Sequence, residues 1–212
     1  MRLDHVSYAA EEDGLRETAA RLAAVIGVEP VEAGVHPRYG TRNVVLPLAG
    51  EHYIEVLEML DHPVAEKVPF GRAVRERTRT GGGWFGWVVA VDDLDPVERR
   101  LGREPLPGNR RRTDGTELRW RQIGVNGLGV DPLLPFVRQW EVEARMRPSA
   151  GAEPPVRLAS IRLAGDPARV CGWLGRPASS PLHDVGIEWA APRGAPGVLS
   201  VRFETPTGPV VI

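Results

Sequence analysis

The sequence predicts an α+β protein made of repeated units with the order strand, helix, strand, strand, strand. Three passes through this order can be followed along the 212 residues, and turns rich in glycine or proline separate many of the strands. In the strands that flank the turns, apolar and polar side chains alternate, which is typical of a sheet with one covered face. Each unit alone would leave one sheet face bare, so we expect the units to pair in mixed or antiparallel sheets.

The first unit, residues 1–60, opens with a short strand around His5. Apolar residues at spacings of three to four then predict an amphipathic helix with the stripe Leu15, Ala19, Leu22 and Ile26. Asp13 is placed to cap this helix, and Gly27 to end it. The rest of the unit is expected to be a Pro/Gly-rich stretch over residues 30–40 and two or three antiparallel strands, two of them over 41–48 and 52–59.

The second unit, residues 82–145, follows a segment at 61–80 that leaves the pattern and holds a short helix. A strand over 84–91 comes first. Asp95 and the proline after it then combine a preferred cap with a first-turn proline, which predicts a helix that ends at Gly102. The unit closes with a basic loop and two strands, over residues 105–115, 116–125 and 133–140.

The third unit, residues 155–212, follows a linker over 148–155 that is rich in proline, alanine and glycine. Its first strand is expected over 156–163, and Asp166, again before a proline, opens a helix. Three strands complete the unit, over residues 184–189, 198–204 and 209–212. We expect this βαβββ-like unit to pack on one domain, residues 1–145, that the first two units form.

Composition and charge are typical of a globular protein of the cytoplasm. The 27 basic and 28 acidic side chains create no overall field that points to nucleic acid or a membrane surface, and the run Arg110–Arg112 is typical of a solvated loop. The single Cys171 excludes an internal disulfide framework and fits a reducing compartment. No apolar run approaches the ~20 residues that cross a bilayer. The chain opens on a strand pattern, so we expect no signal peptide.

The strand over 52–59 carries a carboxylate among apolar neighbours, with Tyr53, Glu55, Leu57 and Met59 on one face. An unpaired carboxylate on a covered face would cost several kcal/mol or would hold its proton, so a cationic partner is expected. His5, on the first strand, is the candidate. The pair is either half of a divalent-metal site or a hydrogen-bonded pair that holds the sheet together.

Three passages of the sequence together resemble the glyoxalase-like branch of the vicinal oxygen chelate superfamily: Leu3–Val6, His36–Asn43 leading to Tyr53–Glu55, and Arg110–Arg121. The resemblance covers about residues 1–145. It implies that the sheets of paired units curl into a cup around one divalent ion, with Zn, Ni, Mn and Fe as alternatives. Such an ion chelates two substrate oxygens and stabilises an enediolate-like anion, while a carboxylate moves protons.

His5 and Glu55 match the ligand positions of the family's first unit, and Glu55 is also the expected catalytic carboxylate. The second unit departs from the pattern. Its first-strand position falls near Gly86 or Trp87, which cannot be ligands, and on its last strand the candidates are Gln139 and Glu141. His36, from a loop, either completes the shell or belongs to a rigid turn with the proline that follows it.

Four residues are candidates for substrate binding. Asn43 can fix a carbonyl or hydroxyl group, and Arg119 and Arg121 share one face of a strand whose other face carries Trp120. If the arginine face looks into the cup, it neutralises an anion; if the tryptophan face does, stacking replaces ion pairing. The arginines alternatively pair with surface acids.

The sequence supports three functional hypotheses. The first is a small-molecule enzyme of the glyoxalase-like class, a lyase, isomerase or dioxygenase of unknown substrate. The second is a metal-free protein that sequesters a small molecule in the same cup. The third is a scaffold whose third unit mediates homodimerisation, which Trp173 and Trp189 would favour if they were exposed on one surface.

Overall fold

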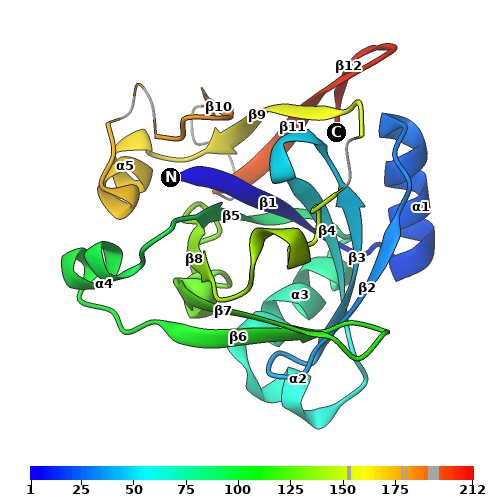
Figure 1. The fold of residues 1–212 in the computed structure, drawn as a ribbon, viewed down its shortest axis with the longest axis horizontal. Coiled ribbons are helices and arrows are strands. Elements are labelled where there is room, and N and C mark those ends of the chain that lie inside the picture. Colours follow the sequence, from blue (N-terminus) through cyan, green and yellow to red (C-terminus); the bar gives the residue numbers. More distant parts are fainter. Residues whose placement is uncertain (152–153, 178, 180, 191–195) are drawn as a thin grey trace.

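The structure is a computed structural model that describes residues 1–151, 154–177, 179, 181–190 and 196–212. Residues 152–153, in the predicted linker, lie outside the described part. Within that part the chain forms a closed eight-stranded barrel and a separate four-stranded sheet that lies across the outside of the barrel (Figure 1). The prediction of an α+β fold with a curled sheet is confirmed. No described helix is both long and apolar enough to cross a membrane.

The first half of the barrel contains β1 (Arg2–Ala9), α1 (Leu15–Ile26), β2 (Val31–His36), β3 (Thr41–Pro47), the short 3-10 helix η1 (Ala49–Glu51) and β4 (Tyr53–Met59). The helix α1 ends at Gly27 in the left-handed conformation, as predicted. The predicted cap at Asp13 is wrong. Gly14 occupies the cap position, and Asp13 instead accepts a hydrogen bond from the Thr18 hydroxyl at 2.9 Å.

The second half contains α2 (Pro63–Lys67), α3 (Pro69–Arg79), β5 (Gly83–Ala90), α4 (Asp95–Leu101), β6 (Leu106–Arg111), β7 (Glu117–Ile123), η2 (Val125–Gly127), β8 (Phe136–Trp140) and η3 (Ala144–Met146). The order around the barrel is β1-β4-β3-β2-β6-β7-β8-β5. Antiparallel pairing of β1 with β5 and of β2 with β6 joins the two halves and closes the sheet.

Both strands at the second junction were missed in the sequence. Residues 30–40 were expected to be a Pro/Gly-rich connection and 105–115 a basic loop, but they contain β2 and β6. In β6, Gly108 and Arg110 are buried while Arg111 is exposed, so the strand does alternate. The alternation is hidden because its inward positions carry a glycine and a charged side chain, and neither is typical of a covered face.

The second sheet is formed by β9 (Arg157–Ala164), β10 (Gly186–Ala190), β11 (Gly197–Thr205) and β12 (Gly208–Val211), with α5 (Pro167–Leu174) between β9 and β10. Asp166 caps α5 by accepting a hydrogen bond from the Ala168 amide at 2.8 Å, as predicted. The strand order is β10-β9-β11-β12, so the strand that follows the helix lies beside the first strand. In the first unit, the last strand holds that place.

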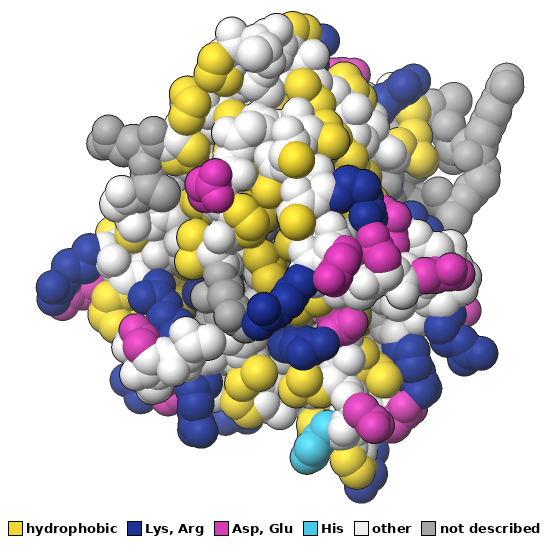
Figure 2. All heavy atoms as spheres, turned by 90° about the vertical axis from the view of Figure 1, so that its right-hand side faces the viewer, with side chains coloured by type: hydrophobic (Ala, Val, Ile, Leu, Met, Phe, Trp, Pro, Cys, Tyr) yellow, Lys and Arg dark blue, Asp and Glu magenta, His cyan; other side chains and the backbone are white. Residues whose placement is uncertain are grey.

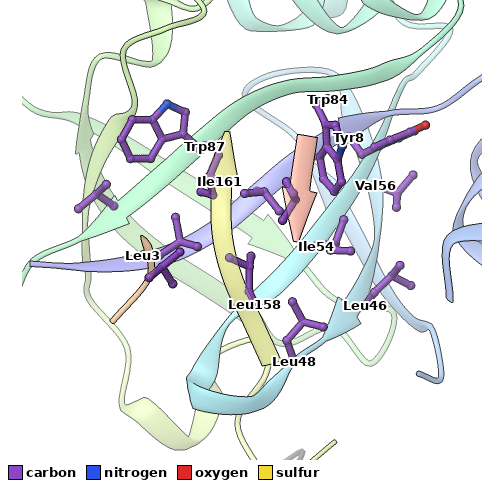
Figure 3. Close-up of a cluster of buried hydrophobic side chains, with 14 of the residues drawn as sticks. Leu3, Tyr8, Leu46, Leu48, Ile54, Val56, Trp84, Trp87, Leu158 and Ile161 are labelled. Carbon is purple, nitrogen blue, oxygen red and sulfur yellow. The ribbon is translucent and has the colours of Figure 1, made fainter. Parts of the chain in front are cut away.

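The outer face of the barrel and the second sheet share one apolar core. Figure 3 shows Leu158 and Ile161 of β9 beside Leu3 of β1 and Ile54 of β4, all fully buried. On the face of the molecule drawn in Figure 2, acidic and basic side chains are interspersed. A smaller apolar cluster lies at the end of the barrel interior that α3 covers, and it contains Leu57, Phe70, Val74, Phe85 and Phe136 among others. The space between the two clusters is polar.

Candidate active site in the barrel interior

An irregularity in β1 turns two consecutive side chains toward the interior. In the ladder with β5, Leu3 pairs with Val89 and His5 pairs with Val88, so Asp4 is an extra residue in a β-bulge. Asp4 and His5 are both buried. The ring Nδ1 of His5 lies 2.9 Å from Asp4 Oδ2, at hydrogen-bond distance. The bulge therefore gives the histidine a carboxylate partner from its own strand.

The predicted pair, His5 and Glu55, does meet. The parallel strands β1 and β4 place His5 Nε2 3.2 Å from Glu55 Oε2. The other carboxylate oxygen, Oε1, accepts a hydrogen bond of 2.6 Å from the side-chain amide of Asn43 on β3. The His5 ring also stacks on Tyr53, with 4.5 Å between the ring centroids. Three of the predicted site residues thus converge at the centre of the barrel.

His36, at the end of β2, adds a second imidazole to the group. Its Nε2 lies 3.5 Å from Glu55 Oε1, and its Nδ1 lies 3.1 Å from the Thr41 hydroxyl. Burial, which outweighs the attraction of Glu55, lowers the pKa of His36 to about 4. His36 is therefore neutral at neutral pH, and it faces the carboxylate without a charge.

Arg138 of β8 supplies a positive charge to the same interior. Its Nη1 lies 3.5 Å from Asp4 Oδ2 and 3.3 Å from the Tyr53 hydroxyl. The guanidinium also lies against the Trp120 and Trp140 rings, 4.3 Å and 4.9 Å from their centroids. This is a favourable cation-π arrangement for a desolvated cation.

Asp4 is the anion at the other end of this network. Its Oδ1 accepts a hydrogen bond of 2.8 Å from the Trp140 indole, and its Oδ2 accepts one of 3.1 Å from the Tyr53 hydroxyl. Burial alone would raise the pKa of Asp4. The hydrogen bond and charge of His5 and the charge of Arg138 outweigh it and hold the pKa well below its usual range. Asp4 therefore stays ionised.

The pKa of Glu55 is lowered in the same way. Burial acts to raise it, but the neighbouring His5, then His36 and Arg138, act more strongly in the other direction. The carboxylate is 5% exposed and yet ionised. A buried, charged carboxylate with a histidine on each side can accept a proton from a bound molecule, and nearby guanidinium groups can stabilise an anion.

The interior does not offer a complete shell for a divalent ion. His5 Nε2 is buried without a hydrogen bond, a feature that a metal ion would satisfy. However, no three histidine, cysteine, aspartate or glutamate side chains among the described residues are grouped as such an ion requires. The inward side chain of β8 is the cationic Arg138, which would repel a cation. Metal binding by His5 and Glu55 stays a prediction.

The third predicted ligand, Gln139, faces the outside of the barrel. Its Oε1 accepts hydrogen bonds from the Leu94 amide at 3.0 Å and from Arg121 Nη2 at 2.9 Å. This amide is therefore engaged away from His5 and Glu55. Strand alternation explains the difference, because neighbouring side chains of β8 point to opposite faces and Arg138 takes the inner one.

Of the two faces of β7, the tryptophan face looks inward. Trp120 is buried, whereas Arg119 is exposed and Arg121 forms an ion pair with Asp95 at 3.1 Å. The structure thus does not bring these two arginines to the site. Gln122, on the inner face with Trp120, donates a hydrogen bond to the Tyr39 hydroxyl.

Sequence reasoning named His36 as a residue that can complete the shell, and the structure places it beside Glu55. It missed four other features of the interior: Asp4, Tyr53 as a stacking partner, Arg110 and Arg138. A signal for Arg138 exists, since it alternates with Phe136 and Trp140 on one face of a strand. No signal exists for Asp4, because simple alternation places it opposite His5.

One cavity lies inside this interior, and a second lies beside it. The smaller lies beside His36, Glu55, Trp120 and Arg138 and holds about 10 Å³, roughly the room that one water molecule needs. The larger, about 460 Å³, lies at the end of the barrel opposite α3 and is lined by Val45 and Pro47 of β3 and by Arg110.

Comparison with known proteins identifies one family and several structural neighbours. The family model described as a glyoxalase-like domain matches residues 3–176. No curated protein sequence matches the chain. A hypothetical protein from Staphylococcus aureus has a similar structure, with a TM-score of 0.66 and 14% identity over 92% of this chain and 88% of that one. This similarity shows a shared fold.

Two methylmalonyl-CoA epimerases are more distant neighbours. The enzyme from Mycobacterium tuberculosis is 18% identical over 68% of this chain and 90% of its own, with a TM-score of 0.44. A single-residue variant of the Streptomyces coelicolor enzyme is 20% identical over 66% of this chain and 96% of its own, with a TM-score of 0.42. Neither similarity is close enough to indicate an activity for this chain.

Proposed function

Because the chain belongs to the glyoxalase-like domain family, we propose that it is a small-molecule enzyme and that Glu55 moves a proton in the barrel interior. The observation that supports this proposal is an ionised carboxylate, 5% exposed, at the centre of a barrel with an open end. Replacing a buried ion pair by well-packed apolar side chains is often neutral or stabilising, so stability alone does not account for charges at this place. The proposed reaction class is removal of a proton from a carbon beside a carbonyl group.

In this reaction Glu55 takes the proton, and the electron pair of the broken C–H bond moves to the carbonyl oxygen. The lowered pKa keeps Glu55 ionised but makes it a weak base, so the anion that forms must be stabilised. Arg138 supplies positive charge to the interior. Asn43 and His5 hold the carboxylate in place. Return of the proton to either face of the carbon would complete an isomerisation.

Hydrogen exchange into a panel of small carbonyl compounds tests the proposal. Each compound, including 2-oxo acids, is incubated with the protein in D₂O and followed by NMR. We expect at least one compound to exchange its C–H, and Glu55→Gln to slow that exchange about 100-fold or more. Glu58→Gln is the matched control, since Glu58 lies on the same strand and pairs with the exposed Arg42. Exchange that survives Glu55→Gln would contradict the assignment.

A metal-dependent form of the same enzyme is the version that the family resemblance implies. A divalent ion would be held by His5 and Glu55 and would polarise a substrate oxygen. Elemental analysis of protein purified without added metal tests it. About one equivalent of metal that is lost in both His5→Ala and Glu55→Ala would support this version, and metal content that is unaffected by either change would end it.

A metal-free binding protein is the second candidate. Asp4 and Glu55 already accept hydrogen bonds from neighbouring side chains, so few of their acceptor positions are free for a substrate. The cavity beside Glu55, about 10 Å³, is also too small for a substrate. If ligands bind in the open pocket while no compound exchanges hydrogen, this candidate replaces the enzyme.

A further inference from the structure

We propose that the open end of the barrel is an anion subsite, in which the Arg110 guanidinium binds a carboxylate or phosphate group of the substrate. The proposal deepens the proposed function and rests on it, because the ligand is a substrate only if the protein is an enzyme. The binding of an anion can be tested without any turnover. The occupant is a small molecule with one such group and an uncharged part that extends toward Glu55.

Arg110 is a buried cation without a partner of its own. The side chain is 3% exposed, and within the described part of the chain it forms no ion pair and no hydrogen bond, with Nε buried and unpaired. Arg138, the other buried arginine, has Asp4, Tyr53 and two aromatic rings around it. An uncompensated buried charge is costly, so a missing anion is the simplest explanation.

The electrostatics of Arg110 agree with this interpretation. Burial lowers the pKa of its guanidinium, and the nearby Tyr53 and Glu55 only partly offset that effect. Glu55 is shared with His5 and Asn43 and does not form an ion pair with Arg110. Glu55 acts electrostatically on Arg110, so a ligand anion placed on Arg110 would belong to the same charged interior.

Three further arginines line the same pocket, but each is already engaged. Arg112 donates to the Met146 carbonyl at 2.7 Å, Arg147 pairs with Glu51 at 3.3 Å, and Arg145 pairs with Glu143 at 2.6 Å. One acid, Asp114, is also in the lining. Of the four arginines in this lining, Arg110 is the one that forms no ion pair and no hydrogen bond within the described residues.

The size and shape of the pocket define the ligand class. Its volume of about 460 Å³ is within the range of small-molecule sites. Val31, Val45, Pro47 and Pro148 give it apolar walls. A guanidinium forms two parallel hydrogen bonds with either a carboxylate or a phosphate. The geometry therefore fits a small organic acid or a small phosphate ester, and the two are separated by experiment.

The test measures the binding of inorganic phosphate and of malonate to the full chain by calorimetry, at constant ionic strength. We expect the wild type to bind at least one of them, and Arg110→Met to weaken that binding at least tenfold. Arg42→Met is the matched control, because Arg42 is exposed on β3. Tighter binding of malonate would indicate an organic acid as the ligand, and tighter binding of phosphate would indicate a phosphate ester. Equal affinity of wild type and Arg110→Met, or no binding of either anion, would overturn the proposal.

Stability distinguishes a binding role of Arg110 from a structural one. In buffer without either anion, Arg110→Met should be at least as stable as the wild type, because an unpaired buried charge has been removed. If the variant fails to fold, the arginine serves the structure, and the proposal then depends on the wild type. There the Nε–H NMR signal of Arg110 must shift on addition of the anion, and an unchanged signal would end the proposal.

The outcomes also separate this inference from the proposed function. Glu55→Gln should retain anion binding while it loses hydrogen exchange. Anion binding without exchange in the wild type would leave the subsite standing and the enzyme refuted. Exchange that is indifferent to Arg110→Met would leave the enzyme standing and the subsite refuted.

Discussion

The titration of His36 predicts how the stability of the barrel depends on pH. The folded state holds the pKa of His36 at about 4, against 6.5 for a free histidine. Because the folded pKa is depressed, the unfolded chain binds the proton more readily. The stabilisation is therefore complete above pH 6.5 and is lost as the pH falls toward 4.

The size of the effect follows from that shift. Each pKa unit corresponds to about 1.4 kcal/mol, so His36 changes the free energy of unfolding by about 3 kcal/mol over the whole titration. About 2 kcal/mol of this change falls between pH 7 and pH 5. Glu55, Arg110, Arg138 and His5 are the charged or titratable groups that act on His36. The buried carboxylates Asp4 and Glu55 have free values of 3.8 and 4.5, so they lose their own contribution mainly below this window.

Urea unfolding at pH 7 and pH 5 measures the free energy of unfolding for three proteins. We expect the wild type and the control His183→Gln, an exposed histidine, to lose about 2 kcal/mol more than His36→Gln does. The glutamine can still accept a hydrogen bond from Thr41. If all three proteins lose the same free energy, His36 is not buried and neutral as described. Should His36→Gln fail to fold, the His36 ring signal of the wild type must titrate well below pH 6.

Three substitutions test the packing and charges of the barrel by urea unfolding and melting temperature. Asp4→Asn leaves its buried arginine partner unpaired and should cost about 3 to 5 kcal/mol; a loss below about 1 kcal/mol would mean that the interior is hydrated. Gly108→Ala places a methyl group on the Trp120 indole and should lower the melting temperature, while Gly127→Ala, with open space around it, should not. Leu158→Ala, at the contact of the barrel with the second sheet, should cost about 2 to 5 kcal/mol and retain one transition; two separate transitions would contradict a shared core.

Periodicity predicted the parts of the site in which charge and alternation agree. In β4 the alternation of Tyr53, Glu55 and Leu57 indicated one inner face, and these side chains lie in the barrel. The carboxylate in that alternation then required a cationic partner, and the predicted partner His5 lies beside it. Asn43, which was expected to hold a substrate group, donates a hydrogen bond to Glu55. The identification of the family was also possible from short passages, and the family model confirms it.

The same reasoning fails where a charged side chain is on the inner face. Arg110 made β6 look like a loop, and Arg138 was overlooked in favour of its neighbour Gln139. Both errors have one cause. Alternation arguments assume that inner positions are apolar, and a barrel with a polar interior violates that assumption at its functional centre.

The bulge at Asp4 explains how this interior holds opposite charges side by side. A regular strand would point Asp4 outward, into the apolar core under the second sheet. The extra residue turns it inward, where it meets Arg138, Tyr53 and Trp140. The interior then has two carboxylates, Asp4 and Glu55, and two guanidinium groups, but only one of the latter is paired. A regular β1 would leave both arginines without an ion pair. The bulge supplies the carboxylate that pairs with Arg138, and Arg110 is left available for the anion of a ligand.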